Sequence, residues 1–519
     1  MDYAIYFLLI VCGFAGLYRQ LQMLQQNSYF PSRYFKWVRE SYLKEIICDA
    51  VLFVIFPILY FLLKPVLAVI LSLLLIIRLF TTRSYIKKSI KKLVFTKRVI
   101  RQIIAIALIY IIMAILFFAI KDSTPRRFLY EILTLLCLFT PIVTLIMWLI
   151  TKPVEDLLGK FYINDAKKIL KNHNNLKVIG VTGSFGKTSV KFILNDILSQ
   201  EYNTLATPGS FNTPFGVVRT VREQLKPQTE IFICEMGAKN IGDIKEICDI
   251  AHPDLGVVTS VGPQHLDTFK SIDNVFATKF ELYDECIKNN GIVFANIDSK
   301  DLADRISQKP KTILTGADTP YHAENITYNM TGSQFDLILD GKIIPVKTKL
   351  LGAHNVSNIV LSAAVAKHLG VSDEKIKRAL FSLKPTPHRL ELKAFANGKP
   401  YIDDAYNSNP VGCLEAVRIL GCFEGYKKVI ITPGLIELGD KEYEANYNLG
   451  LQCAKYCDYV ILVGKNRSKP MLDALKESNY NTENTFVAES FATALSKYNE
   501  INEKAILLIE NDLPDNYLN

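Results

Sequence analysis

The chain has 519 residues, of which 50% are hydrophobic and 21% charged, and its formal net charge is +9. A chain of this length and composition holds several folded domains and is not intrinsically disordered. Many of its cations lie between apolar runs within residues 1–150, so the charge indicates membrane topology rather than nucleic-acid binding. The ten cysteines mostly stand singly, which indicates reduced thiols rather than a disulfide or metal framework.

Residues 1–150 are predicted to form a helical transmembrane region. Long apolar runs cover residues 3–18, 46–80, 102–120 and 128–150. The last two are full-length spans, whereas 46–80 is too long for one crossing and is interrupted by Lys64 and Pro65. This run therefore predicts two short helices or a re-entrant hairpin. A soluble all-helical domain would require polar helix faces, which these runs lack.

Two basic segments, 19–45 and 81–101, separate the apolar runs. Because Lys and Arg are enriched in cytoplasmic loops, both segments are expected on the cytoplasmic side. Five crossings with the N-terminus outside satisfy this rule and place everything after residue 150 inside. The sequence therefore predicts a multi-pass protein of the cytoplasmic (inner) membrane whose domains after residue 150 face the cytoplasm.

Beyond the membrane region we expect an α/β protein in three parts. Residues 151–175 form a linker helix, 176–386 a central domain with a mostly parallel sheet, and 387–519 a C-terminal Rossmann-like domain. Short β-branched segments that alternate with helical stretches indicate the parallel strands. They lie at 178–181, 231–234, 255–259 and 291–295, and again at 400–402, 429–432, 459–463 and 504–509. A smaller antiparallel patch is expected at about 311–350, followed by a helix.

The stretch from Val178 to Ser189 predicts a phosphate-binding loop. A short apolar strand, a glycine-rich turn and a helix start follow one another, so that backbone N–H groups and the helix dipole face an anion. Lys187 would reach the terminal phosphates, and the Thr188 hydroxyl would ligate Mg²⁺. The generic motif has glycine where this chain has Val181. The nucleotide-binding candidates are Gly183, Ser184, Gly186, Lys187, Thr188 and Ser189.

Several further motifs follow in a fixed order, and together they resemble the Mur ligases. The motifs are Thr182–Thr188, Thr207–Asn212, Glu235–Ala238, Gly262–His265, Ala277–Glu281, Gly352–Asn358, His388–Arg389 and Asp403–Pro410. The resemblance covers about 175–519. It implies ATP-dependent amide synthesis, in which a substrate carboxylate attacks the γ-phosphate and an amine then displaces phosphate from the acyl phosphate. The last motif and Ile436–Gly439 are most similar to the branch that adds D-alanyl-D-alanine to UDP-N-acetylmuramoyl-tripeptide in peptidoglycan synthesis.

Two of the motif residues suit a metal site by their position. Glu235 follows an apolar strand, where a carboxylate can hold Mg²⁺ beside phosphates, and His265 lies in a loop after the strand 255–259. Taken alone, His265 would be an ordinary loop histidine and Lys279 a solvated helix lysine. The resemblance implies that Lys279 is carbamylated, which turns a cation into an anionic ligand. It makes Lys187, Glu235, His265 and Lys279 catalytic, and it gives two Mg²⁺ ions the ligands Thr188, Glu235, His265 and Lys279.

The resemblance also implies contacts to the nucleotide and the substrates. Asn358 matches an adenine contact, Arg389 a cation that reaches the phosphates, and Asp404 a ribose-binding carboxylate. Without the motif, the Asx residues around 355–358 would indicate only a helix cap. The residues expected on the substrate side are Asn212, Tyr406, Asn407 and Asn409.

Two departures from the family pattern leave the substrate open. A membrane region of similar length replaces the N-terminal domain with which the family holds the UDP end of its substrate. Asn446 stands where the dipeptide-adding branch usually has His. The alternatives are a ligase for a lipid-linked precursor, or for a pseudomurein-type or polyglutamate-type peptide. From another class, a membrane transporter or scaffold with an ATP-sensing domain is disfavoured by the second metal site.

Overall fold

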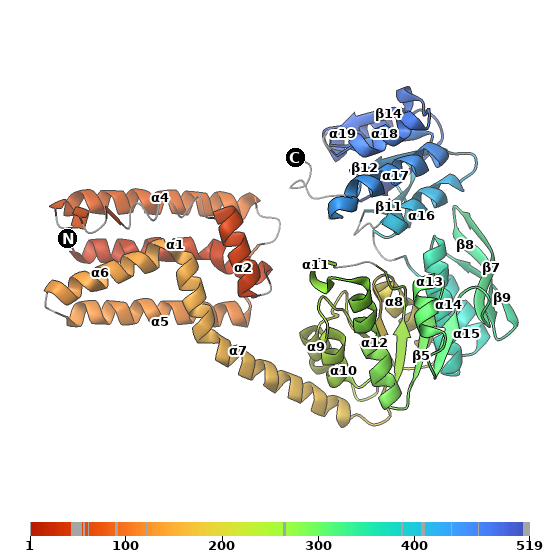
Figure 1. Cartoon of the computed structure of the whole chain (residues 1–519), viewed down its shortest axis with the longest axis horizontal. Helices are drawn as coiled ribbons and strands as arrows, with labels where there is room; N and C mark the ends of the chain where they lie inside the picture. The colour runs from red at the N-terminus through yellow and green to blue at the C-terminus, as the bar shows by residue number, and fades with distance from the viewer. Residues whose placement is uncertain are drawn as a thin grey trace. The chain divides into compact units, whose positions relative to one another are not determined.

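Figure 1 shows the computed structural model of the chain, which forms two compact units, Met1–Tyr162 and Ile163–Asn519. The structure describes residues 2–27, 29–42, 54–55, 58–60, 62–88, 92–120, 123–262, 266–385, 388–405, 410–436, 438–464 and 467–511. Each unit is described by itself below.

The described part of the first unit is helical. Its elements are α1 (Asp2–Gln26), α2 (Pro31–Trp37), the π-helix η1 (Val38–Tyr42), α4 (Lys64–Lys88), α5 (Lys97–Ala119), α6 (Ser123–Leu138) and the first part of α7 (Thr140–Lys171). Among the described residues, Tyr3–Gln26, Lys64–Lys87 and Lys97–Ala119 are long and apolar enough to cross a membrane. The run 46–80 lies partly outside the described residues, and α4 begins at its Lys64–Pro65 interruption.

The predicted single span over 128–150 is wrong, because the helix is broken at Phe139. α6 ends at Leu138 and α7 begins at Thr140, with Pro141 as its second residue. Proline has no backbone N–H, so it is favoured in the first turn of a helix, whereas in a helix interior it removes a hydrogen bond and tends to kink the helix. α7 then runs through to Lys171 with Pro153 inside it, so the linker helix expected at 151–175 is the continuation of α7 (Figure 1).

The second unit contains a central parallel sheet of order β2-β3-β1-β4-β5-β6. Its strands are β1 (Lys177–Thr182), β2 (Thr204–Ala206), β3 (Ile231–Glu235), β4 (Leu255–Val258), β5 (Ile292–Asn296) and β6 (Thr312–Thr315). Its helices are α8 (Lys187–Leu198), α9 (Pro214–Gln224), α10 (Asp243–Ala251), α11 (Leu266–Phe269), α12 (Ile272–Lys288) and α13 (Lys300–Ile306). Parallel neighbours bring the carboxyl ends of β1, β3 and β4 to one edge of the sheet, where ligands bind in folds of this class.

The antiparallel patch predicted at about 311–350 is present only from residue 321 onward, as a separate three-stranded sheet, because β6 pairs parallel with β5 in the central sheet. It comprises β7 (Tyr321–Asn329), β8 (Gly332–Leu339) and β9 (Lys342–Thr348), and α14 (Ala353–His368) and α15 (Asp373–Ser382) follow it. Apolar side chains of α8, α14 and β8 share one core with the central sheet. This packing holds the start of α14 close to the start of α8.

The C-terminal part has a second six-stranded sheet of order β10-β11-β15-β12-β13-β14. The strands are β10 (Glu391–Ala394), β11 (Pro400–Asp404), β12 (Lys427–Thr432), β13 (Tyr459–Val463), β14 (Thr485–Ala488) and β15 (Ala505–Glu510), and all pairings except β10 with β11 are parallel. The helices are α16 (Pro410–Gly421), α17 (Glu442–Tyr456), α18 (Lys469–Glu477) and α19 (Phe491–Asn499), with short 3₁₀ turns at Gly439–Lys441 and Thr482–Asn484.

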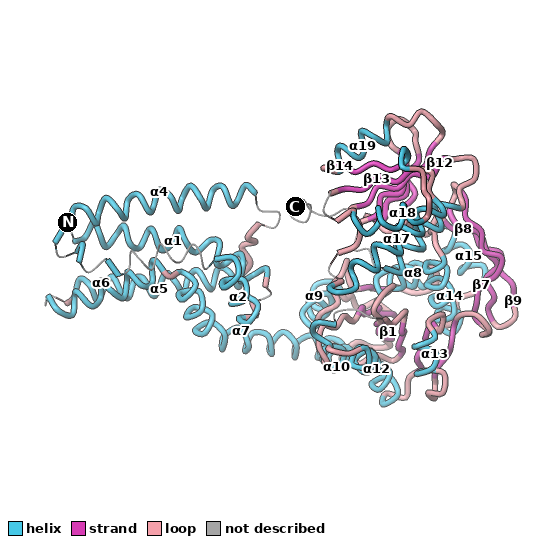
Figure 2. The backbone as a smooth tube through the Cα atoms, turned by 45° about the horizontal axis from the view of Figure 1, so that its top comes forward, coloured by secondary structure: helices cyan, strands magenta, loops and turns pink. Residues whose placement is uncertain are grey.

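Alternate residues of the C-terminal strands face two different cores. Ile430 packs with residues of α16, α17 and α18, whereas Val429 and Ile431 pack with residues of α19. Helices therefore cover both faces of this sheet, and Figure 2 shows α17 and α18 beside its strands. The predicted α/β fold class, with a mostly parallel central sheet and a Rossmann-like C-terminal domain, is confirmed.

Candidate active site

The turn between β1 and α8 has the backbone of a phosphate-binding loop. Gly183 has a φ of 151° and Gly186 a φ of 80°, and both conformations favour glycine. A Cβ atom on Gly183 would lie 1.9 Å from Thr259 Oγ1. α8 begins at Lys187 without a side-chain cap at Gly186, so its first N–H groups point into the turn.

Lys187 is held over this turn by its own loop. Its Nζ donates to the carbonyl oxygens of Gly183 at 2.8 Å and of Ser184 at 2.9 Å. Burial lowers the pKa of Lys187 to about 8; Glu235 opposes this shift, and Arg389 adds to it. The side chain is therefore placed among other charged groups at the mouth of the loop, as expected for a lysine that contacts phosphate.

The loop that follows β4 is tied to the phosphate-binding turn. The backbone N–H of Ser184 donates to Ser260 O at 2.8 Å, and the Ser184 hydroxyl donates to Gly262 O at 2.9 Å. Thr259 Oγ1 donates to Phe185 O at 2.5 Å. These contacts bring the Gly262 end of the Gly262–His265 motif next to the turn. His265 itself lies outside the described residues.

Glu235, the last residue of β3, is buried and accepts several hydrogen bonds. Its Oε1 accepts from Thr188 Oγ1 at 3.1 Å and from Asn212 Nδ2 at 3.0 Å. Its Oε2 accepts from Lys191 Nζ at 2.9 Å, and its backbone N–H donates to Thr207 Oγ1 at 3.1 Å. The structure thus joins two predicted metal ligands, Thr188 and Glu235, and places Asn212 beside them.

Lys279 lies on α12 and is 2% exposed. Burial is the main cause that lowers its pKa to about 7, and the nearby Lys187 ammonium lowers it further. An amine with this pKa is partly neutral near pH 7, and only a neutral amine can react with CO₂. The environment of Lys279 therefore suits the predicted carbamylation better than a solvated helix position would.

The start of α14 reaches the same turn. Asn358 is buried, and a Cβ atom on Gly186 would lie 2.9 Å from Asn358 Oδ1. Ser357, the preceding residue, donates a hydrogen bond to Asp298 at the end of the β5 region. Sequence reasoning missed Asp298 and the neighbouring Asn296, although both follow a predicted strand at the carboxyl edge of the sheet, where polar residues are candidates for ligand contacts.

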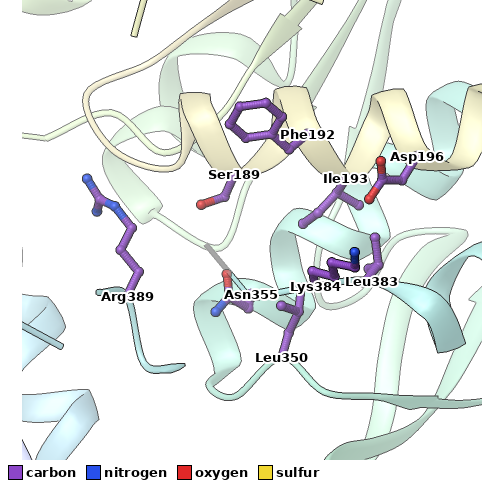
Figure 3. A pocket seen from close by; sticks show the side chains of 9 residues that line it. All are labelled: Ser189, Phe192, Ile193, Asp196, Leu350, Asn355, Leu383, Lys384 and Arg389. Carbon is purple, nitrogen blue, oxygen red and sulfur yellow. The ribbon is translucent and has the colours of Figure 1, made fainter. Parts of the chain in front are cut away.

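A small pocket of about 20 Å³ borders the turn, with room for a water molecule but not for a nucleobase (Figure 3). It is lined by Ser189, Phe192, Ile193, Asp196, Leu350, Asn355, Leu383, Lys384 and Arg389. Arg389 therefore lies beside the first turn of α8, and its guanidinium contributes to the lowered pKa of Lys187. This position agrees with a cation near the nucleotide phosphates.

Asp404 ends β11 at the carboxyl edge of the C-terminal sheet. Its Oδ1 accepts from the backbone N–H of Leu390 at 3.0 Å, and burial raises its pKa to about 6 against the opposing effects of this bond, Glu510 and Arg389. The expected substrate residues Tyr406, Asn407 and Asn409 lie outside the described residues.

Asn446, which replaces the usual His, holds the loop after β12. Its Oδ1 accepts from the N–H of Leu435 at 2.8 Å, and its Nδ2 donates to Leu435 O at 3.0 Å and to Glu442 O at 2.9 Å. The amide is therefore fully engaged with the protein backbone.

The donor set fits Mg²⁺ rather than a softer metal. Thr188 and Glu235 supply hydroxyl and carboxylate oxygens, which Mg²⁺ prefers, and it usually takes few protein ligands plus substrate phosphates. Within the described ranges no group of three or more His, Cys, Asp or Glu could hold a metal alone. A metal here would therefore be held jointly by Thr188, Glu235 and phosphate oxygens.

The central part of the chain is similar to known proteins. Residues 181–366 match the Mur ligase middle domain. The UDP-N-acetylmuramoyl-tripeptide–D-alanyl-D-alanine ligase of Bacillus subtilis is 33% identical over 269 residues, which cover 51% of this chain and 58% of that protein. The ligase of the same name from Escherichia coli is 29% identical over 331 residues, 61% of this chain and 72% of that protein. The chain thus spans less than two thirds of the Bacillus relative.

Solved structures agree with this match. MurF from Acinetobacter baumannii superposes with a TM-score of 0.61 at 25% identity and covers 68% of this chain and 77% of its own. MurF from Thermotoga maritima, solved in complex with ADP, has a TM-score of 0.60 at 25% identity, with coverages of 68% and 80%.

Proposed function

We propose that the chain, whose residues 181–366 match the Mur ligase middle domain, is an ATP-dependent ligase that adds D-alanyl-D-alanine to UDP-N-acetylmuramoyl-tripeptide. Relatives that carry this name match 51% and 61% of the chain, and the MurF structures that share its fold cover 68% of it. The product is a peptidoglycan precursor for the cell wall.

The observation that carries the proposal is the junction of Glu235 and Thr188 beside Lys187. Phosphoryl transfer to a carboxylate mostly requires charge neutralisation and alignment. In the proposed reaction, Lys187 and Arg389 hold the nucleotide phosphates, while the backbone N–H groups of the turn orient them. The acceptor carboxylate attacks the γ-phosphate and ADP leaves; the amine then displaces phosphate from the acyl phosphate.

Two Mg²⁺ ions would neutralise the charge of the phosphate oxygens. Thr188 and Glu235 are the proposed ligands of the first ion. His265 and a carbamylated Lys279 are the proposed ligands of the second ion. The buried position of Lys279 near Lys187 supports this assignment. Asn358 is the proposed adenine contact and Asp404 the proposed ribose contact, while Asn212, Tyr406, Asn407 and Asn409 contact the substrates.

The first unit anchors the enzyme in the cytoplasmic membrane. In the apolar stretches of α4 and α5, only 17% and 22% of the residues are buried within the structure. Exposure of so much apolar helix surface to water is unfavourable, whereas lipid chains would cover it. The basic segments 19–45 and 81–101 support a cytoplasmic location for both of these segments, and the proposal puts the catalytic domains on the same side, with residues 1–150 as the transmembrane part.

The test is phosphate release from ATP by the full chain in detergent. UDP-muramoyl-tripeptide and D-alanyl-D-alanine are supplied separately and together. The proposal expects turnover only when both are present. Turnover that requires a lipid-linked acceptor would instead identify a different acceptor, and no turnover with any acceptor would refute the ligase function.

A further inference from the structure

Lys191 is a buried charge at the site for which the phosphate-binding motif has no use. It lies on α8, one turn after Lys187, and its side chain is 0% exposed. Burying an ammonium group is costly unless it is paired and hydrogen-bonded. The position of Lys191 is therefore explained by its partners rather than by packing.

The ammonium group of Lys191 joins two separate segments. Its Nζ donates to Glu235 Oε2 at 2.9 Å and to the carbonyl oxygen of Gly209 at 2.5 Å. Glu235 ends β3, whereas Gly209 lies in the loop of residues 207–213 between β2 and α9. A lysine ammonium has three donors around a point charge, so it can serve a carboxylate and a carbonyl at once.

The 207–213 loop has further contacts with the same carboxylate and strand. Asn212 Nδ2 donates to Glu235 Oε1, and Thr207 Oγ1 accepts from the N–H of Glu235. The backbone N–H of Gly237 donates to Asn212 O at 2.8 Å. Around Gly209 itself nothing lies within 4 Å of an added Cβ atom, so side-chain packing at that position does not hold the loop.

We propose that Lys191 is a positioning residue that holds the 207–213 loop against the metal-side carboxylate of Glu235. Oε1 of Glu235 then faces Thr188, while Oε2 accepts a hydrogen bond from the Lys191 ammonium group. Lys191 thus adds a charged contact to the two hydrogen bonds by which Asn212 and Thr207 already join this loop to Glu235. The kinetic part of this inference rests on the proposed ligase function, whereas the contacts do not depend on that function.

The experiment compares Lys191→Gln and Lys191→Arg with the unaltered chain and with Lys288→Gln, an exposed lysine on α12. Amide hydrogen exchange over residues 207–213 is measured first. The glutamine variant should exchange faster in this loop but not in α8, and arginine, which keeps the charge, should restore part of the protection. Lys191→Gln leaves the buried carboxylate of Glu235 without its cation, which can prevent folding. If this variant does not fold, loop exchange is compared between Lys191→Arg and the unaltered chain.

The kinetic part follows the Michaelis constant of the acceptor and the affinity for ADP, measured by calorimetry with and without Mg²⁺. Lys191→Gln should raise the acceptor Michaelis constant by about tenfold, the cost of one charge-assisted hydrogen bond. Affinity for ADP without Mg²⁺ should stay unchanged, because the turn itself is intact. Unchanged loop exchange in a folded variant would overturn the inference. Absent turnover in the unaltered chain would instead refute the proposed function and leave the exchange test valid.

Discussion

At the scale of single residues, the site brings together cationic side chains that repel one another unless a polyanion is bound. The buried Lys279 lies near the partly buried Lys187, and burial lowers the pKa of each. Glu235 is the carboxylate that partly offsets the effect at Lys187. A nucleotide triphosphate with Mg²⁺ would complete this charge balance.

Lys187→Ala tests the role of the lysine in the phosphate-binding turn. The variant should lose at least about 100-fold in turnover, because a preorganised cation at the transferred phosphate is removed. Membrane insertion should be unaffected, since the substitution lies in the second unit. Lys288→Ala, on the exposed surface of α12, serves as the control. A near-normal rate in Lys187→Ala would show that the turn does not bind the reacting phosphates.

Lys279 predicts a dependence on pH and on bicarbonate. Its pKa of about 7 means that the neutral amine, which alone reacts with CO₂, becomes the major form as the pH rises above 7. Turnover should therefore rise between about pH 6 and 8 and be stimulated by bicarbonate at the lower end. Because the pKa of Lys187 is also lowered, a pH profile alone would not identify Lys279 as the titrating group. The response to bicarbonate is therefore the diagnostic measurement. If the unaltered chain is indifferent to bicarbonate and Lys279→Met remains active, carbamylation is excluded.

At the scale of elements, substitution of a glycine in the turn distinguishes the effect of backbone conformation from that of a steric clash. Gly183→Ala should lower stability by about 1–3 kcal/mol, because its Cβ atom would clash with Thr259 in addition to the strained φ. Gly425→Ala is the matched control, since its φ of 76° carries the strain with nothing within 4 Å of the new atom. Thermal unfolding in detergent compares the two. Equal losses would mean that Thr259 can move away.

The strands that could be predicted are those with continuous apolar sequence. β1, β3 and β4 are buried on both faces and appear as short β-branched runs bounded by turns. β2 and β14 were missed because three or four residues at a sheet edge leave no such signal. The break at Phe139 was missed because hydropathy over 128–150 is continuous, and only Pro141 marks the new helix start.

The candidate site was predictable where a motif gives the residue and its position together. Gly183, Lys187 and Glu235 come together as the motif order predicted, because neighbouring parallel strands end at one edge. Lys191 could not be found, since a lysine on an amphipathic helix looks like a solvated one until its partners are known. Asn446 was noticed only as a departure, and its role in holding a loop depends on contacts eleven residues away.

At the scale of the whole molecule, Cys422 offers a test of topology. It is exposed, whereas the other cysteines whose burial the structure describes are buried. With the catalytic domains in the cytoplasm, a membrane-impermeant maleimide should label Cys422 in inside-out vesicles but not in intact cells. Cys422→Ser should remove that labelling. Labelling from outside intact cells would contradict the proposed cytoplasmic location of the catalytic domains.

The central claim is that an acceptor carboxylate takes the γ-phosphate of ATP over the turn that ends at Thr188. The direct measurement uses an acceptor peptide whose terminal carboxylate carries ¹⁸O, followed by mass spectrometry of the released phosphate. An acyl phosphate passes one carboxylate oxygen to phosphate when the amine displaces it. We predict phosphate with a single ¹⁸O and an equal amount of amide product. Unlabelled phosphate would mean that water attacks ATP, which would contradict the ligase mechanism.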